Sequence, residues 1–279
     1  MTQSIYPCLW FDGQAKEAAE FYCTVFPDTH ITADTSMVVN FEASGQRFMC
    51  LNGGPSFTIN PSISFFVVYE TEEEVDAAWH QLMNGGSALM PLDKYDWSKK
   101  YGWVQDRFGV NWQLSFGKLE EVGQRFTPVI MFSGNQQGRA EEAIGFYTGL
   151  FQPSQVVGIL RYVKGEPDIE GTVKHAQFKL GDGVMMAMDS SYPHQFGFNE
   201  AVSLVVECKD QREIDHYWNA FTQQGQAGKC GWLKDQFGVS WQIIPANLGQ
   251  LMTAHGKGDR AIQALMRMQK LEIEKLENA

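Results

Sequence analysis

A chain of 279 residues is long enough to bury the cores of two ordinary domains. Its formal net charge of −11 at pH 7 opposes binding to nucleic acid or to an anionic membrane surface, since both need a basic face on the protein. Neither a signal peptide nor a membrane span is expected, and the five scattered cysteines, which form no CxxC pair, favour a reduced, cytoplasmic setting.

The first half of the chain alternates between patterns typical of strands and of helices. Residues 5–11 alternate as a strand does, and residues 14–26 carry apolar side chains at helical spacing. Further elements are expected as strands near 30–42, 46–52, 62–69, 102–106 and 110–116, and as a second helix at 72–84. A helix packed on one face of a curved sheet leaves the other face free to line a cavity, so the pattern indicates an α+β fold.

The second half of the chain repeats the first. Residues 101–115 read YGWVQDRFGVNWQLS and residues 230–244 read CGWLKDQFGVSWQII, with eight identical positions. Two earlier blocks also recur, 7–26 at 128–151 and 57–86 at 196–225. Three blocks in the same order, at a domain-sized distance, predict a duplicated domain rather than a solenoid.

The domain limits follow from the position of the repeats. A polar stretch at 117–126 separates the copies, so domains are predicted at 1–122 and 123–255. The tail, 256–279, carries apolar residues at helical spacing and is predicted to form one amphipathic helix that packs against the body or a partner subunit.

These motifs resemble a known family. The pattern P-x-L-x-F-x-G, A-x-E-A-x-x-FY, S-x-F/L-x-V, E-x-D-x-x-W and GW-x-x-D-x-FG-V-x-WQ is similar to the PhnB-like group of the glyoxalase/bleomycin-resistance/dioxygenase (vicinal oxygen chelate) superfamily. Many members carry the name 3-demethylubiquinone-9 3-methyltransferase domain. The resemblance covers nearly the whole chain and implies tandem glyoxalase-like domains, built of paired βαβββ modules whose curved mixed sheets form cups. Single-copy relatives usually dimerise, so it also implies a pseudo-dimer within one chain; a homodimer of the whole chain stays open.

The two copies differ around the expected cups. The first copy has a long loop at 87–101, with Tyr95, Trp97 and Tyr101, where the second has only 226–230. Such an aromatic loop is suited to cap a small ligand, although Trp97 has packing on its own domain as an alternative. Because the second copy instead has a longer early hairpin at 162–176, the two cups are expected to be unequal.

Polar residues on the last strand of each copy are the main site candidates. Alternation puts Gln113 on the face opposite Trp112, and the repeat does the same for Gln242. A neutral amide in a cup can donate to and accept from a polar ligand, although both glutamines have a purely structural alternative, in which they bond neighbouring backbone. The residues expected to line the cups are Gln113, Gln242, Ser64, Ser203, Phe11, Phe132, Trp97 and Tyr101. No histidine and acid are placed to activate either serine, so no catalytic residue is assigned.

The positions that could hold a metal carry few suitable ligands. The resemblance puts the ligand positions of metal-using relatives on Pro7 and Pro128, Asn52 and Asp189, Ser64 and Ser203, and Gln113 and Gln242. Divalent transition metals prefer imidazole, thiolate or carboxylate ligands, and these positions offer few. Asp189 and Gln242 form the better remnant, so a divalent metal stays open and no cofactor is assigned.

The sequence therefore predicts a small-molecule-binding protein of PhnB-like type, with no nucleic-acid or membrane partner and no assigned activity. Two alternatives stay open: a metal-dependent isomerase, lyase or dioxygenase of the superfamily, and a non-catalytic binding or resistance protein. Methyl transfer is not expected, because the glycine-rich LGDG at 180–183 is predicted to lie between two strands, where a nucleotide-type site needs a strand followed by a helix.

Overall fold

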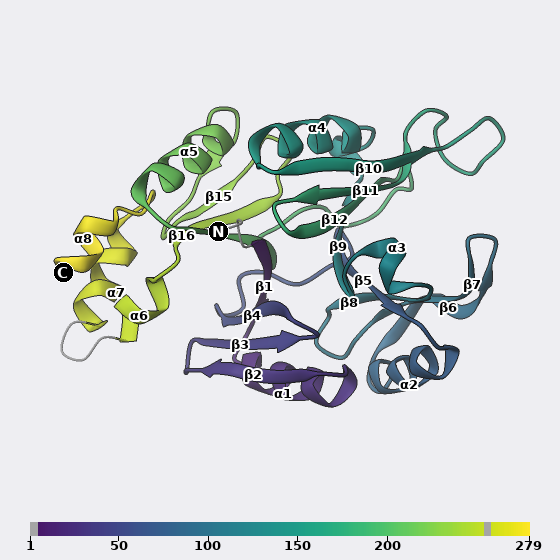
Figure 1. The fold of residues 1–279 in the computed structure, drawn as a ribbon, viewed down its shortest axis with the longest axis horizontal. Coiled ribbons are helices and arrows are strands. Elements are labelled where there is room, and N and C mark those ends of the chain that lie inside the picture. Colours follow the sequence, from purple (N-terminus) through teal and green to yellow (C-terminus); the bar gives the residue numbers. More distant parts are fainter. Residues whose placement is uncertain (1–4, 254–257) are drawn as a thin grey trace.

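The computed structural model describes residues 5–253 and 258–279, which form two mixed eight-stranded sheets with helices packed on them (Figure 1). The first, sheet A, has the order β14-β15-β16-β13-β1-β4-β3-β2, and the second, sheet B, the order β10-β11-β12-β9-β5-β8-β7-β6. The elements predicted from periodicity in the first copy are present. The fold class is thereby confirmed as α+β, with two open mixed sheets.

The strands of sheet A are β1 (Ile5–Phe11), β2 (Thr29–Asp34), β3 (Val38–Ala43), β4 (Gln46–Asn52), β13 (Val202–Cys208), β14 (Gln226–Ala227), β15 (Trp232–Lys234) and β16 (Ser240–Pro245). Those of sheet B are β5 (Ile63–Tyr69), β6 (Ser87–Tyr95), β7 (Ser98–Gln105), β8 (Asn111–Phe116), β9 (Phe126–Phe132), β10 (Ser154–Arg161), β11 (Val173–Leu180) and β12 (Gly183–Asp189). The helices are α1 (Ala15–Val25), α2 (Glu72–Leu82), α3 (Leu119–Val122), α4 (Ala140–Leu150), α5 (Gln211–Thr222), α6 (Leu248–Thr253), α7 (Gly258–Arg267) and α8 (Ile273–Glu277), with a 3-10 turn at Gly134–Gln136.

Each sheet takes strands from both copies of the repeat. Sheet A combines β1 to β4 with β13 to β16, and sheet B combines β5 to β8 with β9 to β12. The joints are the antiparallel pairs β1–β13 and β5–β9, so strands far apart in sequence lie side by side (Figure 1). The expected pairing of modules within one chain is present, but each sheet joins modules of different copies. The domain limits 1–122 and 123–255 stay a prediction.

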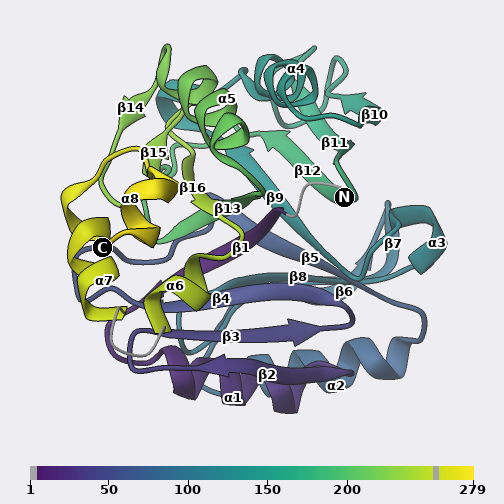
Figure 2. The ribbon, with the colours of Figure 1, turned by 60° about the vertical axis from the view of Figure 1, so that its left-hand side comes forward.

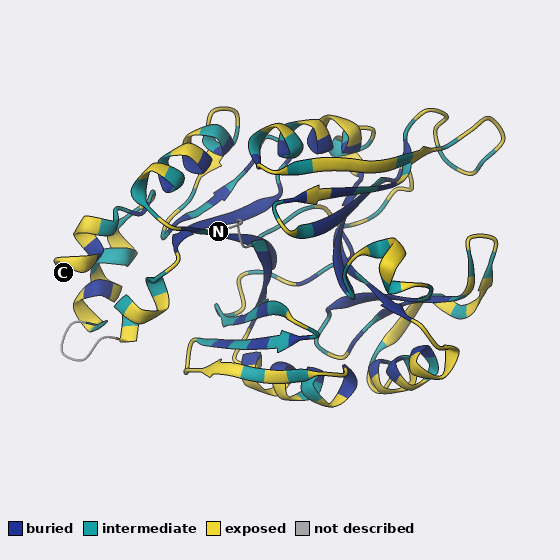
Figure 3. Ribbon diagram, in the orientation of Figure 1, coloured by how far each residue is buried: buried dark blue, intermediate teal, exposed yellow. Residues whose placement is uncertain are grey.

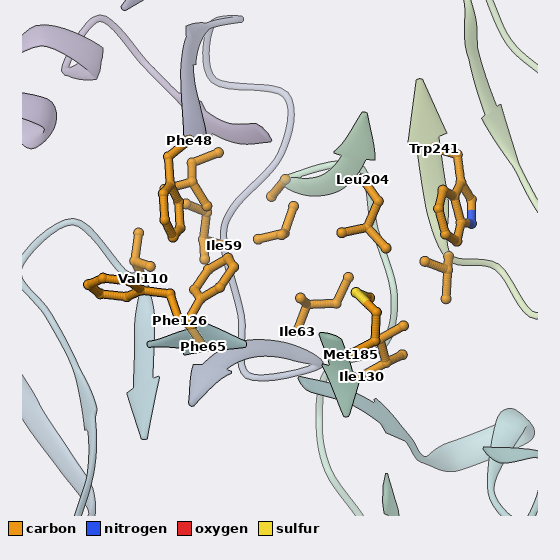
Figure 4. Packing of buried hydrophobic residues seen from close by; sticks show 14 of the residues in the cluster. Phe48, Ile59, Ile63, Phe65, Val110, Phe126, Ile130, Met185, Leu204 and Trp241 are labelled. Carbon is orange, nitrogen blue, oxygen red and sulfur yellow. The ribbon is translucent and has the colours of Figure 1, made fainter. Parts of the chain in front are cut away.

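The helix-covered faces of both sheets share one aromatic core. In the first copy its centre is Trp112, whose ring lies 5.2 Å from that of Tyr22 and 4.7 Å from that of Phe26. The rings of Phe48, Phe65 and Phe126 also contact that of Trp112, and Figure 4 shows these three phenylalanines beside Ile59 and Val110. The second copy builds the same arrangement around Trp241. Colouring by burial shows the central strands of both sheets buried, with exposed residues concentrated on edge strands and outer helix faces (Figure 3).

A buried carboxylate ties the turn between β7 and β8 to helix α1. Asp106 accepts hydrogen bonds from Tyr22 Oη at 2.9 Å and Trp112 Nε1 at 2.8 Å, and from two backbone N–H groups of its own turn. The second copy repeats all four bonds at 2.7–3.0 Å, onto Asp235 from Tyr147 Oη, Trp241 Nε1, Phe237 N and Val239 N. Asp106 and Asp235 therefore cap their turns and also anchor a helix in each copy.

The tail differs from the single helix expected over 256–279. It contains two helices, α7 and α8, separated by residues 268–272, while residues 256 and 257 lie outside the described part of the chain. The intervening carbonyls bond to other elements: Met268 O accepts from Cys230 N and Leu271 O accepts from Gln211 Nε2. Because these carbonyls pair with the body of the protein, the helix is interrupted there.

The expected loop at 87–101 is instead most of the β6–β7 hairpin, because its backbone pairs with β7 and, through β7, extends sheet B.

Among residues 5–253 and 258–279, no helix is both long and apolar enough to cross a membrane.

Candidate functional site

Each sheet has one face that the helices of the repeat leave uncovered. We call the face of sheet A opposite α1 and α5 cup A, and the face of sheet B opposite α2 and α4 cup B. The two faces contain equivalent strands of the two copies. They differ in the segments that cover them.

Cup A is covered by the C-terminal helices. Leu271 is 0% and Leu276 2% exposed, and both pack in a separate apolar cluster with Tyr6, Cys8 and Ile244 of the sheet. The helices α6, α7 and α8 lie together along β1 and β16 (Figure 2). The tail thus occupies cup A with its own side chains.

The polar side chains of cup A, Gln242 and Ser203, are buried. Gln242 Nε2 donates to Ser203 Oγ at 3.0 Å, and Cys8 lies opposite Ser203 across the β1–β13 pair. Burial raises the pKa of the Cys8 thiol to about 12. Because the thiolate is the nucleophilic form, Cys8 is held as an inert thiol.

Cup B holds a buried chain of three polar side chains. Tyr101 Oη donates to Gln113 Oε1 at 2.7 Å, and Gln113 Nε2 donates to Ser64 Oγ at 2.8 Å. They come from adjacent strands, since β8 pairs with β7 on one side and β5 on the other. Burial raises the pKa of Tyr101, so its phenol stays a donor. Gln113 faces cup B, as predicted, and is the middle member of this hydrogen-bonded series.

Apolar and aromatic side chains surround that polar chain. Tyr101, Trp103 and Met131 are buried together, with partly buried side chains packed on them from the rest of cup B: Phe66, Met90, Tyr95, Met188 and Phe196. Trp103 is 8% exposed, and its Nε1 has no hydrogen-bond partner among the described residues. A buried indole N–H normally has an acceptor, so this N–H is a candidate donor to an oxygen or nitrogen atom of a ligand.

An aromatic ladder leads from cup B to solvent. Trp97 is 62% exposed and stacks on Tyr95 with ring centroids 4.9 Å apart. Both rings also meet Tyr101 edge-on, at 5.8 and 5.6 Å. The β6–β7 hairpin therefore carries aromatic surface from the floor of cup B to its rim.

Two predicted cup residues lie elsewhere. Phe11 and Phe132 were expected to line the cups, but both belong to the core on the helix-covered face. Phe11 packs edge-on against Phe108, and Phe132 against Phe198 and Phe237. Alternation separates the two faces of a strand, yet it does not tell which face the helices will cover.

Sequence reasoning missed Trp103, which recurs in the second copy as Trp232. The signal was present, since alternation along β7 puts Trp103 on the same face as Tyr101. Met131 left no comparable signal, because it reaches cup B only through the pairing of β9 with β5, and Phe196 left none, because it lies in the loop between β12 and β13.

The metal-ligand positions do not assemble into a site. Asp189 lies in sheet B and Gln242 in sheet A, so the weak pair is not brought together. Asp189 accepts from Gly138 N, Ala140 N and Val173 N at 2.8–3.2 Å, which commits its carboxylate to the start of α4. Among residues 5–253 and 258–279, no three His, Cys, Asp or Glu side chains are grouped to hold a metal ion. This donor set does not fit a divalent transition metal.

Comparison with known proteins gives one family and a set of related folds. A family model described as 3-demethylubiquinone-9 3-methyltransferase matches residues 3–115 and again residues 124–244. A search of curated proteins gives no match. Among solved structures, the PhnB protein of Bacillus cereus, which carries the same methyltransferase name, is 38% identical over 41% of this chain and 100% of its own, with a TM-score of 0.40.

Two more distant structures are also similar. Glyoxalase I from Zea mays is 11% identical over 91% of this chain and 98% of its own, with a TM-score of 0.60. A protein from Pseudomonas aeruginosa is 22% identical over 39% of this chain and 93% of its own, with a TM-score of 0.35. At 11% identity the maize enzyme shares the fold of the whole chain, and nothing about activity follows from that likeness alone.

Proposed function

The chain belongs to the 3-demethylubiquinone-9 3-methyltransferase family of the glyoxalase (vicinal oxygen chelate) superfamily, and from this premise we propose that it binds one small molecule per chain, in cup B. The ligand class is a small, largely apolar or aromatic molecule that carries a hydrogen-bond acceptor. Whether binding is followed by a reaction depends on groups at the rim of the same cup.

The observation that carries the proposal is the unpartnered indole N–H of Trp103 within an apolar, methionine-rich and aromatic surface. Ligand sites combine such surfaces with a few placed polar groups, and the chain Tyr101–Gln113–Ser64 supplies further polar groups nearby. An acceptor oxygen on the ligand would satisfy Trp103 Nε1, while a planar body would pack on the rings of the hairpin.

The limit of one ligand per chain rests on the tail. In cup A the buried Leu271 and Leu276 take the volume that a ligand would need. In cup B the equivalent region carries the β6–β7 hairpin with its exposed Trp97. The two halves of the repeat thus support unequal roles.

Methyl transfer is not part of the proposal, despite the family's name. The LGDG segment joins β11 to β12 as a hairpin turn, so no helix follows it to receive a nucleotide-like cofactor. The metal-dependent alternative is not favoured by the donor set described above. A purely sequestering protein, without turnover, remains the competing form of the same proposal.

The experiment uses the indole N–H as a reporter. A panel of small aromatic acids, phenols, quinones and esters is titrated into 15N-labelled protein, with the Trp103 Nε1–H resonance assigned from Trp103→Phe. Binding compounds are expected to shift that resonance and to give a stoichiometry near one by calorimetry. Gln113→Ala is expected to weaken binding by about 5- to 150-fold, the equivalent of roughly 1–3 kcal/mol for a lost buried hydrogen-bonding group.

The repeat provides the matched control. Gln242→Ala makes the same change in cup A and is expected to leave affinity unchanged. Two ligands per chain, or affinity lost in Gln242→Ala and kept in Gln113→Ala, would overturn the assignment to cup B.

A further inference from the structure

A second pair of polar residues lies at the rim of cup B and has no equivalent in cup A. Ser190 follows β12, and its N–H donates to Phe132 O at 2.9 Å. In the first copy Gly53 takes the same place, because its N–H donates to Phe11 O at 3.0 Å. A Cβ added to Gly53 would meet the ring of Trp10 at 2.2 Å.

That clash shows where the side chain of Ser190 points. Trp10 has the same parity on β1 as Cys8, and its ring packs edge-on against Trp232, the strand partner of Gln242, so it lies on the cup face of sheet A. The equivalent residue on β9 is Met131, which lines cup B. A side chain at position 190 is therefore directed onto the cup B face, beside Met131.

His194 completes the pair. Its Nε2 lies 3.0 Å from Ser190 Oγ, and its ring centroid lies 4.7 Å from that of Phe196, one of the side chains packed in cup B. Burial lowers the pKa of His194, with the nearby Asp168 carboxylate opposing that shift, so the imidazole is neutral near pH 7 and free to accept a proton.

The second copy's longer hairpin helps to hold this turn. Asp168, in the loop between β10 and β11, accepts from Ser191 N at 3.0 Å, next to Ser190. Beside these two residues, Ile169 and Tyr192 are 50% and 69% exposed. The first copy reads Gly-Gly-Pro-Ser-Phe at 53–57, two residues shorter and without histidine. The arrangement is thus specific to the cup that the tail leaves open.

We propose that Ser190 is a nucleophile activated by His194 and that it takes the acyl group of a small ester bound in cup B. A hydroxyl within hydrogen-bond reach of a neutral imidazole is the arrangement of an activated serine. The exposed apolar residues at the rim suit an apolar acyl or alcohol group. This inference rests on the binding role proposed for cup B.

The reaction balances without a cofactor. Ser190 Oγ attacks the ester carbonyl carbon while its proton passes to His194 Nε2, and the new O–C bond replaces the bond to the leaving alcohol. The imidazolium then returns that proton to the departing alkoxide. In the second half, His194 takes a proton from water as the hydroxide attacks the acyl-serine, and the proton returns to Ser190 Oγ as the carboxylic acid leaves.

The test uses p-nitrophenyl butyrate as substrate and a fluorophosphonate as a trapping reagent. Wild-type protein is expected to release a burst of nitrophenolate near one equivalent and to carry the trapped adduct on Ser190, located by peptide mass spectrometry. Ser190→Ala is expected to abolish both signals. His194→Gln is expected to slow acylation by at least about 100-fold, the usual effect of losing a general base. His216→Gln, on the outer helix α5, is the control and is expected to react as wild type.

The outcomes separate this inference from the binding role. If compounds still shift the Trp103 resonance but neither burst nor Ser190 adduct forms, the Ser190–His194 bond only holds the turn and the inference is wrong. An adduct on another residue also overturns it. If no compound binds cup B and no adduct forms, the proposed function fails with it. Should Ser190→Ala not fold, His194→Gln keeps the test decisive, since a wild-type acylation rate in that variant is incompatible with the proposed base.

Discussion

Removing the carboxylate of Asp106 is expected to destabilise the protein more than removing a single one of its hydrogen bonds, such as the one from the Tyr22 hydroxyl. In Asp106→Ala, four buried donors lose their acceptor at once: two side-chain groups, from Tyr22 and Trp112, and two backbone N–H groups. Each unsatisfied buried donor costs about 1–3 kcal/mol, which sets the upper bound. Burial raises the pKa of Asp106, so the native charge is itself unfavourable and offsets part of that loss. The expected net cost is about 3–5 kcal/mol, the range for breaking a buried charged network.

The measurement is urea unfolding followed by tryptophan fluorescence, with the dependence on denaturant checked so that a shifted midpoint reports stability. Tyr22→Phe is the matched control, because it removes one of the four bonds and is expected to cost about 1 kcal/mol. Asp235→Ala and Tyr147→Phe repeat the comparison in the second copy, where the same bonds recur. If Asp106→Ala costs no more than Tyr22→Phe, the carboxylate does not anchor helix α1 and the reasoning is refuted.

Three further predictions concern the same framework. Burial raises the pKa of Asp106 and Asp235 in the folded protein above the ordinary 3.8. Folding therefore takes up protons, and the contribution of these two carboxyl groups to stability falls as the pH rises from 3.8 through the raised pKa. Urea midpoints measured across that pH window should fall less steeply in a variant with both residues changed to Asn. Leu271→Ala, at a fully buried site, should lower the free energy of unfolding by about 2–5 kcal/mol and speed the reaction of Cys8 with a thiol reagent. An unchanged rate of Cys8 labelling would contradict the coverage of cup A by the tail. Trp97→Ala should alter stability by less than about 0.5 kcal/mol because the ring is exposed, yet it should weaken ligand binding to cup B. Calorimetry with the same compounds checks this, and an unchanged affinity would show that Trp97 does not contact the ligand.

Local patterns in the sequence were enough for much of the architecture. The repeat of the Trp112 and Trp241 segments predicted two copies, and alternation correctly separated Gln113 from Trp112 on opposite faces of β8. The long segment at 87–101 also predicted unequal cups, although the difference that the structure shows comes from the tail, which packs on cup A. These features follow from the sequence alone because strand parity and helical spacing are properties of a few neighbouring residues.

The site itself depended on contacts between residues far apart in the chain. Only the tertiary structure joins β1 to β13 and β5 to β9, and only then do Met131 and Phe196 reach the cup that holds Gln113. Phe11 shows the limit of parity, since the packing of α1 decides which of the two faces becomes core.

The interruption of the tail helix and the contact between Ser190 and His194 likewise depend on residues distant in sequence. Whether residues 268–272 continue a helix depends on carbonyl acceptors that pair with α5 and with the segment before β15, two elements distant in sequence. The contact between Ser190 and His194 requires the turn that Asp168 holds from another loop. Short-range backbone preferences determine each element of this protein, whereas the free energy of packing those elements together determines which cup the tail covers.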